Sequence, residues 1–413
     1  MEGESMLGRE EVMALIASQL VAYGYADVGQ EVAARAELPE TGESSSRLEE
    51  LVTLGLRSEE QGARQSGADT RAGSESGIDL SGEGHSLAQA PQYSVWYKTK
   101  HKGAATAAAF SSDGRYIATG SADASLKLIE VDRVRSPAAG SARREDKPVI
   151  RTLYHHDAEV TGLAFHPNGL VLASCSADRS IKLFDLSVAY GKHSFQSFRD
   201  NYAYRSIAFH PSGDYLVAGG DSCEVRLYNV RTGKAYLLGA GDSPDLACHS
   251  AAVTRVCYST DGALIASASG DGAIKLWSGV SGKCMRTIDR AHAAKPVTGV
   301  VFSRCSKYVL STGLDSHVRL WDVASGNPVQ TYEGAALDSP GPQAVFSYDD
   351  ALVMVPDCRS NKIVSWDTVT GTLVARNADH KQQITWIAAS PTMPALMTCS
   401  VDECVRFWCS DTA

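Results

Sequence analysis

The chain has 413 residues, of which 44% are hydrophobic and 21% charged, so most of it is expected to fold around a core. None of the ten cysteines stand in C-x-x-C spacing, which argues against a zinc site of the usual kind and against a disulfide scaffold. No apolar run reaches the roughly 18 residues of a membrane helix, and no signal-peptide pattern is present. These features predict a soluble intracellular protein without metal or cofactor.

The net charge of −9 is unevenly distributed. Residues 1–92 hold 17 acidic and 6 basic side chains, so the acidity lies at the N-terminus. The rest of the chain is close to neutral and shows no broad basic footprint for nucleic acid.

Residues 1–57 are predicted to form short helices. Apolar side chains recur there at helical spacing, at Val12, Leu15, Ile16, Leu20 and Tyr23. Short helices bury too little surface to stand alone comfortably. Their apolar stripe is expected to pair with a second copy of the chain, the alternative being packing on the domain formed by the rest of the chain; a two-fold dimer is the commonest solution for such a face.

Residues 58–92 contain six glycines and no aromatic residue, which predicts a flexible linker. Its one apolar island is GIDL, at 77–80. This island either docks on another surface or is a chance apolar pair.

From residue 93 onward the chain repeats itself. An aromatic or apolar landmark recurs every 42 to 55 residues, at Ile129, Phe184, Tyr228, Trp277, Trp321, Trp366 and Trp408. Trp321 and Trp366 are each followed by aspartate. A period of about 40–45 residues with a Trp-Asp dipeptide is the signature of WD repeats, so we expect a mostly β, seven-bladed propeller.

Five repeats also share a histidine, a serine or threonine, and an aspartate. The aspartate lies 22 or 23 residues after the histidine and four residues after the hydroxyl residue. The sets are His101, Thr119, Asp123; His156, Ser174, Asp178; His249, Ser267, Asp271; His292, Ser311, Asp315; and His380, Thr398, Asp402.

These residue types also form hydrolase triads, but an enzyme seldom needs five copies of a nucleophile. We therefore expect no catalytic residue here, but a structural network in which the aspartate accepts hydrogen bonds from histidine and serine. Repeats three and six lose the set together: Ala218 and Ser222 replace the hydroxyl residue and aspartate in one, Pro356 and Ser360 in the other.

The last repeat ends too early to complete its blade. Only five residues follow Trp408, so its fourth strand is missing. The β-type run YSVWYK, at 93–98, precedes the first repeat and is expected to supply that strand. The propeller should then span 93–413 and have no open edge.

An insertion after the first repeat is rich in basic residues, namely Arg133, Arg135, Arg143, Arg144 and Lys147. It is either a solvated loop or a contact for RNA phosphates or an acidic partner.

Several longer runs resemble the WD-repeat subunits of cleavage stimulation factor, a family that acts in 3′-end processing of messenger RNA precursors. The resemblance covers nearly the whole chain. It is carried by GYADVGQEVAARAEL, GIDL, TGSADASLKLIEVDR, PVIRTLYHHDAEVTGLAFHP, RSIAFHPSGDYLVAGG, DGAIKLWSGVSGKCMRTIDRAH and MTCSVDECVRFW. The chain departs from the family in its alanine-rich second helix and in a shorter insertion after the first repeat.

The resemblance implies an N-terminal homodimerisation domain and a non-catalytic role in a nuclear complex. In this chain the residues that the resemblance implies in dimerisation are Leu15, Ile16, Leu20, Tyr23 and Tyr25. The implied partners are the helical-repeat scaffold subunit of that factor and the cleavage and polyadenylation specificity factor. RNA contact would be mostly indirect, through a separate subunit, and no membrane is involved.

Two other functions compete with this interpretation. The propeller could contact RNA directly, or the chain could be an adaptor of another nuclear complex, such as a ubiquitin ligase or a co-repressor.

Overall fold

The computed structural model describes residues 78, 91–135, 148–188, 191, 193–239, 248–339, 341 and 343–410. The chain divides into two compact units, Met1–Ser74 and Glu75–Ala413. The first unit lies outside the described residues, as do the helices expected in 1–57 and the five dimerisation residues.

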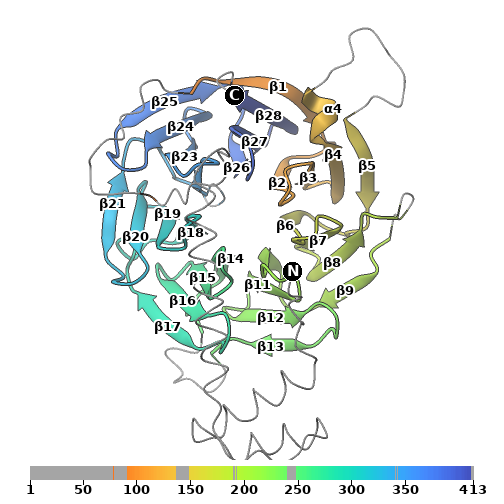
Figure 1. Ribbon diagram of the computed structural model, residues 1–413, viewed down its shortest axis with the longest axis horizontal. Helices are drawn as coiled ribbons and strands as arrows, with labels where there is room; N and C mark the ends of the chain where they lie inside the picture. The colour runs from red at the N-terminus through yellow and green to blue at the C-terminus, as the bar shows by residue number, and fades with distance from the viewer. Residues whose placement is uncertain are drawn as a thin grey trace, which may run out of the picture. The chain divides into compact units, whose positions relative to one another are not determined.

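The second unit is a ring of seven four-stranded antiparallel sheets, shown in Figure 1. The predicted seven-bladed propeller is therefore confirmed. Each blade is numbered here from the first repeat, and its strands are given from the innermost to the outermost.

Blade one contains β2 (Ala105–Phe110), β3 (Tyr116–Ser121), β4 (Ser125–Glu130) and β5 (Val149–Tyr154). Blade two contains β6 (Val160–Phe165), β7 (Val171–Ser176), β8 (Ser180–Asp185) and β9 (Gln196–Arg199). Blade three contains β10 (Tyr204–Phe209), β11 (Tyr215–Gly220), β12 (Val225–Asn229) and β13 (Ala235–Leu237). Blade four contains β14 (Val253–Tyr258), β15 (Leu264–Ser269), β16 (Ile274–Ser278) and β17 (Cys284–Ile288).

Blade five contains β18 (Val297–Phe302), β19 (Tyr308–Gly313), β20 (Val318–Asp322) and β21 (Pro328–Tyr332). Blade six contains β22 (Val345–Phe346), β23 (Leu352–Asp357), β24 (Lys362–Asp367) and β25 (Leu373–Ala378). Blade seven contains β26 (Ile384–Ala389), β27 (Ala395–Ser400), β28 (Cys404–Ser410) and β1 (Tyr93–Lys100).

Blade seven joins the two ends of the ring. Its outer strand β1 pairs antiparallel with β28, from Tyr93 opposite Ser410 to Lys100 opposite Cys404. The strand is two residues longer than the run 93–98 that the sequence suggested. This pairing gives the last blade its fourth strand, as a closed ring requires.

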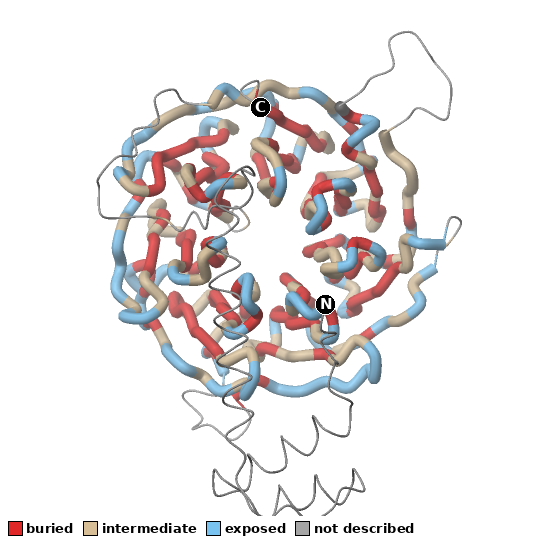
Figure 2. Tube along the Cα trace, in the orientation of Figure 1, coloured by how far each residue is buried: buried red, intermediate tan, exposed pale blue. Residues whose placement is uncertain are grey.

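The apolar core lies between neighbouring sheets, as the buried segments in Figure 2 show. The second strands are buried almost throughout because both of their faces meet other blades. One cluster spans blades one, two and seven and includes Leu126, Leu163 and Phe407. Each blade therefore depends on both neighbours for its burial.

The turns that join the first two strands of each blade also contact one another. Gly213 and Gly262 occupy this turn in blades three and four with positive φ values of 85° and 74°. A Cβ atom at Gly213 would fall 2.1 Å from Nε2 of His166, and one at Gly262 would fall 2.5 Å from Nε2 of His210. Glycine is required at these positions by both the conformation and the neighbouring ring.

Candidate functional site

The histidine sets of five blades come together as hydrogen-bonded networks. In blade two, Nδ1 of His156 lies 2.7 Å from the carboxylate of Asp178, and Nε2 lies 2.7 Å from Oγ of Ser174. Because a carboxylate can only accept, Nδ1 carries the proton and the Ser174 hydroxyl donates to Nε2. The serine thus donates to the histidine, and not to the aspartate as the sequence analysis expected.

Blades four, five and seven repeat this geometry. The Nδ1–carboxylate distances are 3.0 Å, 2.8 Å and 3.1 Å, and Nε2 lies 2.7 Å from the hydroxyl oxygen in all three. Blade one differs, because Nδ1 of His101 contacts Ser125 at 2.9 Å while Asp123 lies 3.9 Å away. Its Nε2 still reaches Thr119, at 2.9 Å.

Three tryptophans extend the network, and the sequence analysis did not assign them this role. The indole Nε1 groups of Trp277, Trp321 and Trp408 donate to the hydroxyl oxygens of Ser267, Ser311 and Thr398 at 2.8–2.9 Å. Each tryptophan lies six residues after the aspartate of its set, and this spacing was a readable signal. Ile129 and Phe184 occupy the same place in blades one and two, where no indole donor is available.

A cation completes each network and was also missed. Four residues after each aspartate stands Lys127, Lys182, Lys275, Arg319 or Arg406. Each of them donates to the backbone carbonyl of the residue that precedes the histidine. The cation therefore fixes the strand end that carries the histidine and offsets the charge of the aspartate.

The protonation states follow from burial and hydrogen bonding. Burial lowers the pKa of His101 and His380 to about 4, so both are neutral at physiological pH. Burial alone would raise the pKa of Asp178, but hydrogen bonds from Ser180 and His156 bring it down to about 2. A neutral histidine thus lies between an ionised aspartate and a hydroxyl group.

These networks are poorly suited to nucleophilic catalysis. The five hydroxyl residues are fully buried, and in three blades the oxygen already accepts an indole hydrogen bond. A substrate would have no path to the oxygen atom. The geometry favours a structural role for all fifteen residues.

Blades three and six use other contacts where the network is missing. In blade three, Asp200 stands at the histidine position and pairs with Arg226 at 2.7 Å, while the hydroxyl groups of Tyr204 and Tyr228 are 2.6 Å apart. In blade six the corresponding pair is Arg359 with Asp338, at 2.6 Å, and both side chains are exposed. Blade three therefore has a partly buried replacement, whereas in blade six the ion pair is exposed and buried Asp357 accepts a hydrogen bond from Ser360 at 2.8 Å.

The innermost strands carry a second set of polar contacts around the central channel. Six of them contain a β-bulge after their first residue, and the bulged residue is Thr106, Thr161, Arg205, Thr254, Thr298 or Thr385. Four of the threonines donate to a carbonyl of the next blade's inner strand at 2.5–2.7 Å. These bonds link blades seven, one, two and three in sequence, and blade four to blade five.

The basic insertion lies within blade one, between β4 and β5, and not after it as expected; it begins as a helix instead of a loop. Residues Val131–Arg135 form α4, and its Val131 and Val134 side chains are buried. Nε of Arg133 pairs with Glu130 at 2.5 Å. Arg135 ends the helix, and Arg143, Arg144 and Lys147 lie outside the described residues.

One residue of the linker island has a defined place. Ile78 packs against an apolar cluster of blades five and six that includes Leu320, Leu337 and Val355. The island thus contacts the propeller, one of the two alternatives left open by the sequence.

The described part of the chain contains no group of three or more histidine, cysteine or acidic side chains placed to hold a metal ion. No helix among the described residues is long and apolar enough to cross a membrane.

Six segments of the chain match the WD domain, G-beta repeat family, at residues 94–130, 147–185, 194–229, 244–278, 282–322 and 371–409. The interval 323–370 does not match, and it contains β22, β23 and β24 of blade six. Blade six, one of the two blades without the histidine network, is therefore also the one without the repeat signature.

Two kinds of relative are found. The chain is 38% identical to cleavage stimulation factor subunit 50 of Arabidopsis thaliana, over 96% of this chain and 95% of that protein. It is 27% identical to pre-mRNA-processing factor 19 homolog 2 of Arabidopsis thaliana, over 43% of this chain and 31% of that protein. It is 30% identical to apoptotic protease-activating factor 1 of Homo sapiens, over 32% of this chain and 10% of that protein.

The partial matches have the extent expected of a shared repeat, whereas the first match spans both chains almost completely. The resemblance seen in the sequence is confirmed: the chain belongs to the WD-repeat family of cleavage stimulation factor subunit 50.

Proposed function

We propose that this protein is a non-catalytic scaffold subunit of a nuclear complex that cleaves and polyadenylates messenger RNA precursors. The observation that carries the proposal is the 38% identity to cleavage stimulation factor subunit 50 over 96% of the chain. A match of that extent continues beyond the propeller, whose first strand begins at Tyr93, into the N-terminal segment. Both parts are therefore proposed to act together, the segment in dimerisation and the propeller in binding other subunits.

The proposed dimer uses the apolar stripe of residues 1–57. Burying Leu15, Ile16, Leu20, Tyr23 and Tyr25 against a second copy would remove a large apolar surface from water. Deleting 1–57 is expected to give a monomer in sedimentation equilibrium, and Leu20→Asp should weaken the dimer. Val280→Asp, at a fully exposed site of the propeller, is the matched control. A truncated protein that still sediments as a dimer would refute this role.

The proposed partners are the helical-repeat scaffold subunit of cleavage stimulation factor and, through the assembly, the cleavage and polyadenylation specificity factor. The test is a tagged pull-down from nuclear extract with the full chain and with residues 75–413, read by mass spectrometry. Recovery of the scaffold subunit with both proteins would support binding through the propeller. Recovery of a ubiquitin ligase or co-repressor instead would replace the proposed function with the adaptor alternative.

A second candidate is direct RNA binding, and the basic insertion between β4 and β5 of blade one motivates it. Arg143, Arg144 and Lys147 would contact phosphates, so binding should fall steeply with salt. A GU-rich oligonucleotide should then bind the full chain at low salt and bind the triple glutamine variant less tightly. Absence of binding at low salt would end this alternative.

A further inference from the structure

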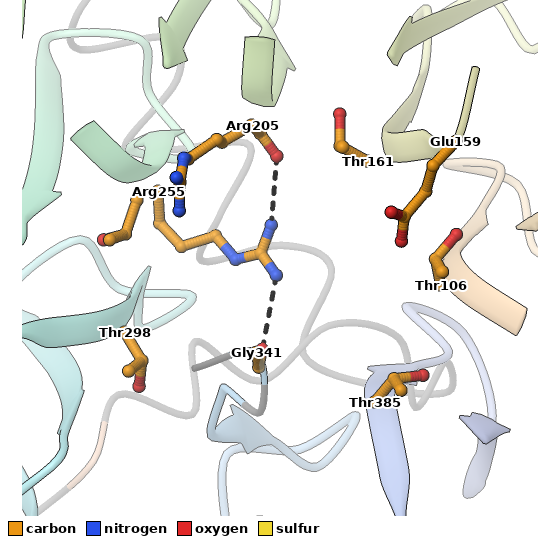
Figure 3. Close-up of a pocket in the computed structure, with 9 residues that line it drawn as sticks. Thr106, Glu159, Thr161, Arg205, Arg255, Thr298, Gly341 and Thr385 are labelled. Atoms are coloured by element: carbon orange, nitrogen blue, oxygen red, sulfur yellow. Dashed lines mark hydrogen bonds between the residues drawn. The ribbon is translucent and has the colours of Figure 1, made fainter. Parts of the chain in front are cut away.

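One mouth of the central channel contains a hollow of about 310 Å³. Figure 3 shows the side chains that surround it, which come from the inner strands of six blades and from loops beside them. They include the bulged threonines, Glu159, Arg205 and Arg255, together with Gly341 from the loop that precedes blade six. The hollow is large enough for one amino-acid side chain and part of its backbone.

Arg255 reaches into this hollow from β14 and is incompletely paired. Its Nη1 and Nη2 atoms lie 3.4 Å from the carbonyl oxygens of Arg205 and Gly341, which is long for a hydrogen bond. Its Nε finds no hydrogen-bond partner among the described residues, although only 8% of the residue is exposed. The guanidinium carbon lies 3.9 Å from the centre of the Trp386 ring.

Trp386 presents a second unpaired donor at the same place. It lies on β26 of blade seven, is 7% exposed, and its indole Nε1 has no partner within the described part of the chain. Two buried N–H donors that lack acceptors are costly, and native structures normally satisfy such groups. Of the two residues, Arg255 lines the hollow, so an acceptor group that enters it can pair with the guanidinium.

Charge indicates what kind of acceptor fits. Burial lowers the pKa of Arg255 only to about 10, so it remains a cation at neutral pH. The other arginine of the hollow, Arg205, is already paired with Asp221 at 2.6 Å. Glu159 lines the hollow but makes no ion pair with Arg255. A buried cation without a carboxylate favours an anion of matching size.

The neighbouring acidic group limits that anion to a small one. Glu159 would repel a polyphosphate chain, which argues against RNA at this mouth. A single carboxylate can approach Arg255 while the N–H groups of its own backbone face Glu159 and the threonine oxygens. This pattern of donors and acceptors is that of a peptide.

We infer that the channel mouth binds an aspartate or glutamate side chain of a partner protein, with its carboxylate on Arg255, whose guanidinium stacks on the Trp386 ring. The inference concerns the chemistry of recognition and does not depend on the proposed role in RNA processing. The partner segment would enter beside Gly341 and Arg205, the two residues whose carbonyl groups hold the guanidinium.

The experiment uses the full chain with its six tryptophans replaced by 5-fluorotryptophan, so that ¹⁹F NMR reports each ring. Trp386→Phe assigns the signal of interest. The probes are acetyl-Gly-Ser-Glu-Ser-Gly-amide, the same peptide with Gln in place of Glu, and inorganic phosphate. We expect the Glu peptide to shift the Trp386 signal with a Kd of about 1 mM, and the Gln peptide to bind at least tenfold more weakly.

Arg255→Gln should abolish the shift, whereas Arg231→Gln, at an exposed turn of blade three, should leave it unchanged. Equal binding of the Glu and Gln peptides would overturn the inference, and so would a shift caused by phosphate but not by the Glu peptide. No shift with any probe would mean that the hollow holds only water, which also overturns it. The wild-type comparison of the two peptides decides the question even if Arg255→Gln fails to fold.

Discussion

Blades one, two, four, five and seven share one buried polar network, whereas blades three and six are built without it. The two groups also differ at the channel. Threonine hydroxyls on the inner strands of blades seven, one, two and four bond to the next blade, but blade three has Arg205 in that position and blade six has a two-residue inner strand. The carbonyl groups that hold Arg255 come from blade three and from the loop before blade six.

The comparison teaches that the repeat is interrupted where the channel mouth is formed. A blade that keeps its histidine needs a short, fixed entry to its inner strand, because the cation binds the residue before that histidine. Without the histidine, the loop before blade six can reach the channel, where Gly341 lies. Loss of the structural network thus accompanies gain of a binding surface.

The largest effect should come from removing one aspartate of the network. Asp271→Ala in blade four would leave the Nδ1–H of His249 and the backbone N–H groups of Ser250 and Ala273 without their acceptor. We expect the free energy of unfolding to fall by about 3 kcal/mol, measured by urea denaturation.

Ser222→Ala, at the equivalent position of blade three, is the matched control. It should cost less than about 0.5 kcal/mol because Ser222 makes only a 3.5 Å contact with the carbonyl of Glu224. Equal losses in the two variants would show that the networks do not distinguish the two groups of blades.

The next largest effect is expected from acidification, which should destabilise the blades that contain the histidine network. His101 and His380 have a pKa of about 4 in the folded chain, below the unfolded value of 6.5. As pH falls below 6.5 the unfolded state binds protons that the folded state does not, so stability decreases until the pH reaches about 4. Each of the two histidines should reduce the free energy of unfolding by about 2 kcal/mol between pH 7 and pH 5.

The check is urea denaturation of the wild type and His380→Gln at both pH values. The variant should be less stable at pH 7 but should lose about 2 kcal/mol less on acidification. An unchanged pH dependence would mean that His380 is not held neutral by burial.

The rates of amide hydrogen exchange are expected to differ between the blades. Blade six lacks the histidine network and has a two-residue inner strand, and its Arg359–Asp338 ion pair is exposed. Its β23 and β24 amides are expected to exchange about tenfold faster than those of β15 and β16 in blade four, with blade three between them. Uniform protection across the seven blades would contradict the comparison.

The fold could be predicted well from the sequence because the spacing of the recurring residues gives the length of one repeat. The seven landmarks from Ile129 to Trp408 and the five histidine sets were enough to count blades, and the run 93–98 was correctly predicted to supply the outer strand of the last blade. The direction of the hydrogen bonds within the histidine network could not be predicted in the same way. Whether Ser174 donates to His156 or to Asp178 depends on distances between three separate strand ends, and spacing does not report these.

The channel mouth was the hardest feature to predict. Arg255 and Trp386 are 131 positions apart in the sequence. Each departs from the residue type that the other repeats have at the equivalent position. Only closure of the ring brings their side chains together. Departures from a repeat are visible in a sequence, but their meeting point requires the structure.

The smallest expected effect concerns the linker. Ile78→Ser should remove part of the apolar contact with the cluster that includes Leu337 and Val355, at a cost of about 1 kcal/mol or less. Because that cluster spans blades five and six, the change should speed exchange of the β23 amides and leave β15 unaffected. Val280→Ser, at a fully exposed valine, is the control and should change neither. If Ile78→Ser leaves β23 unchanged as well, Ile78 adds nothing to the stability of blade six, and the difference between the two groups of blades lies in the propeller alone.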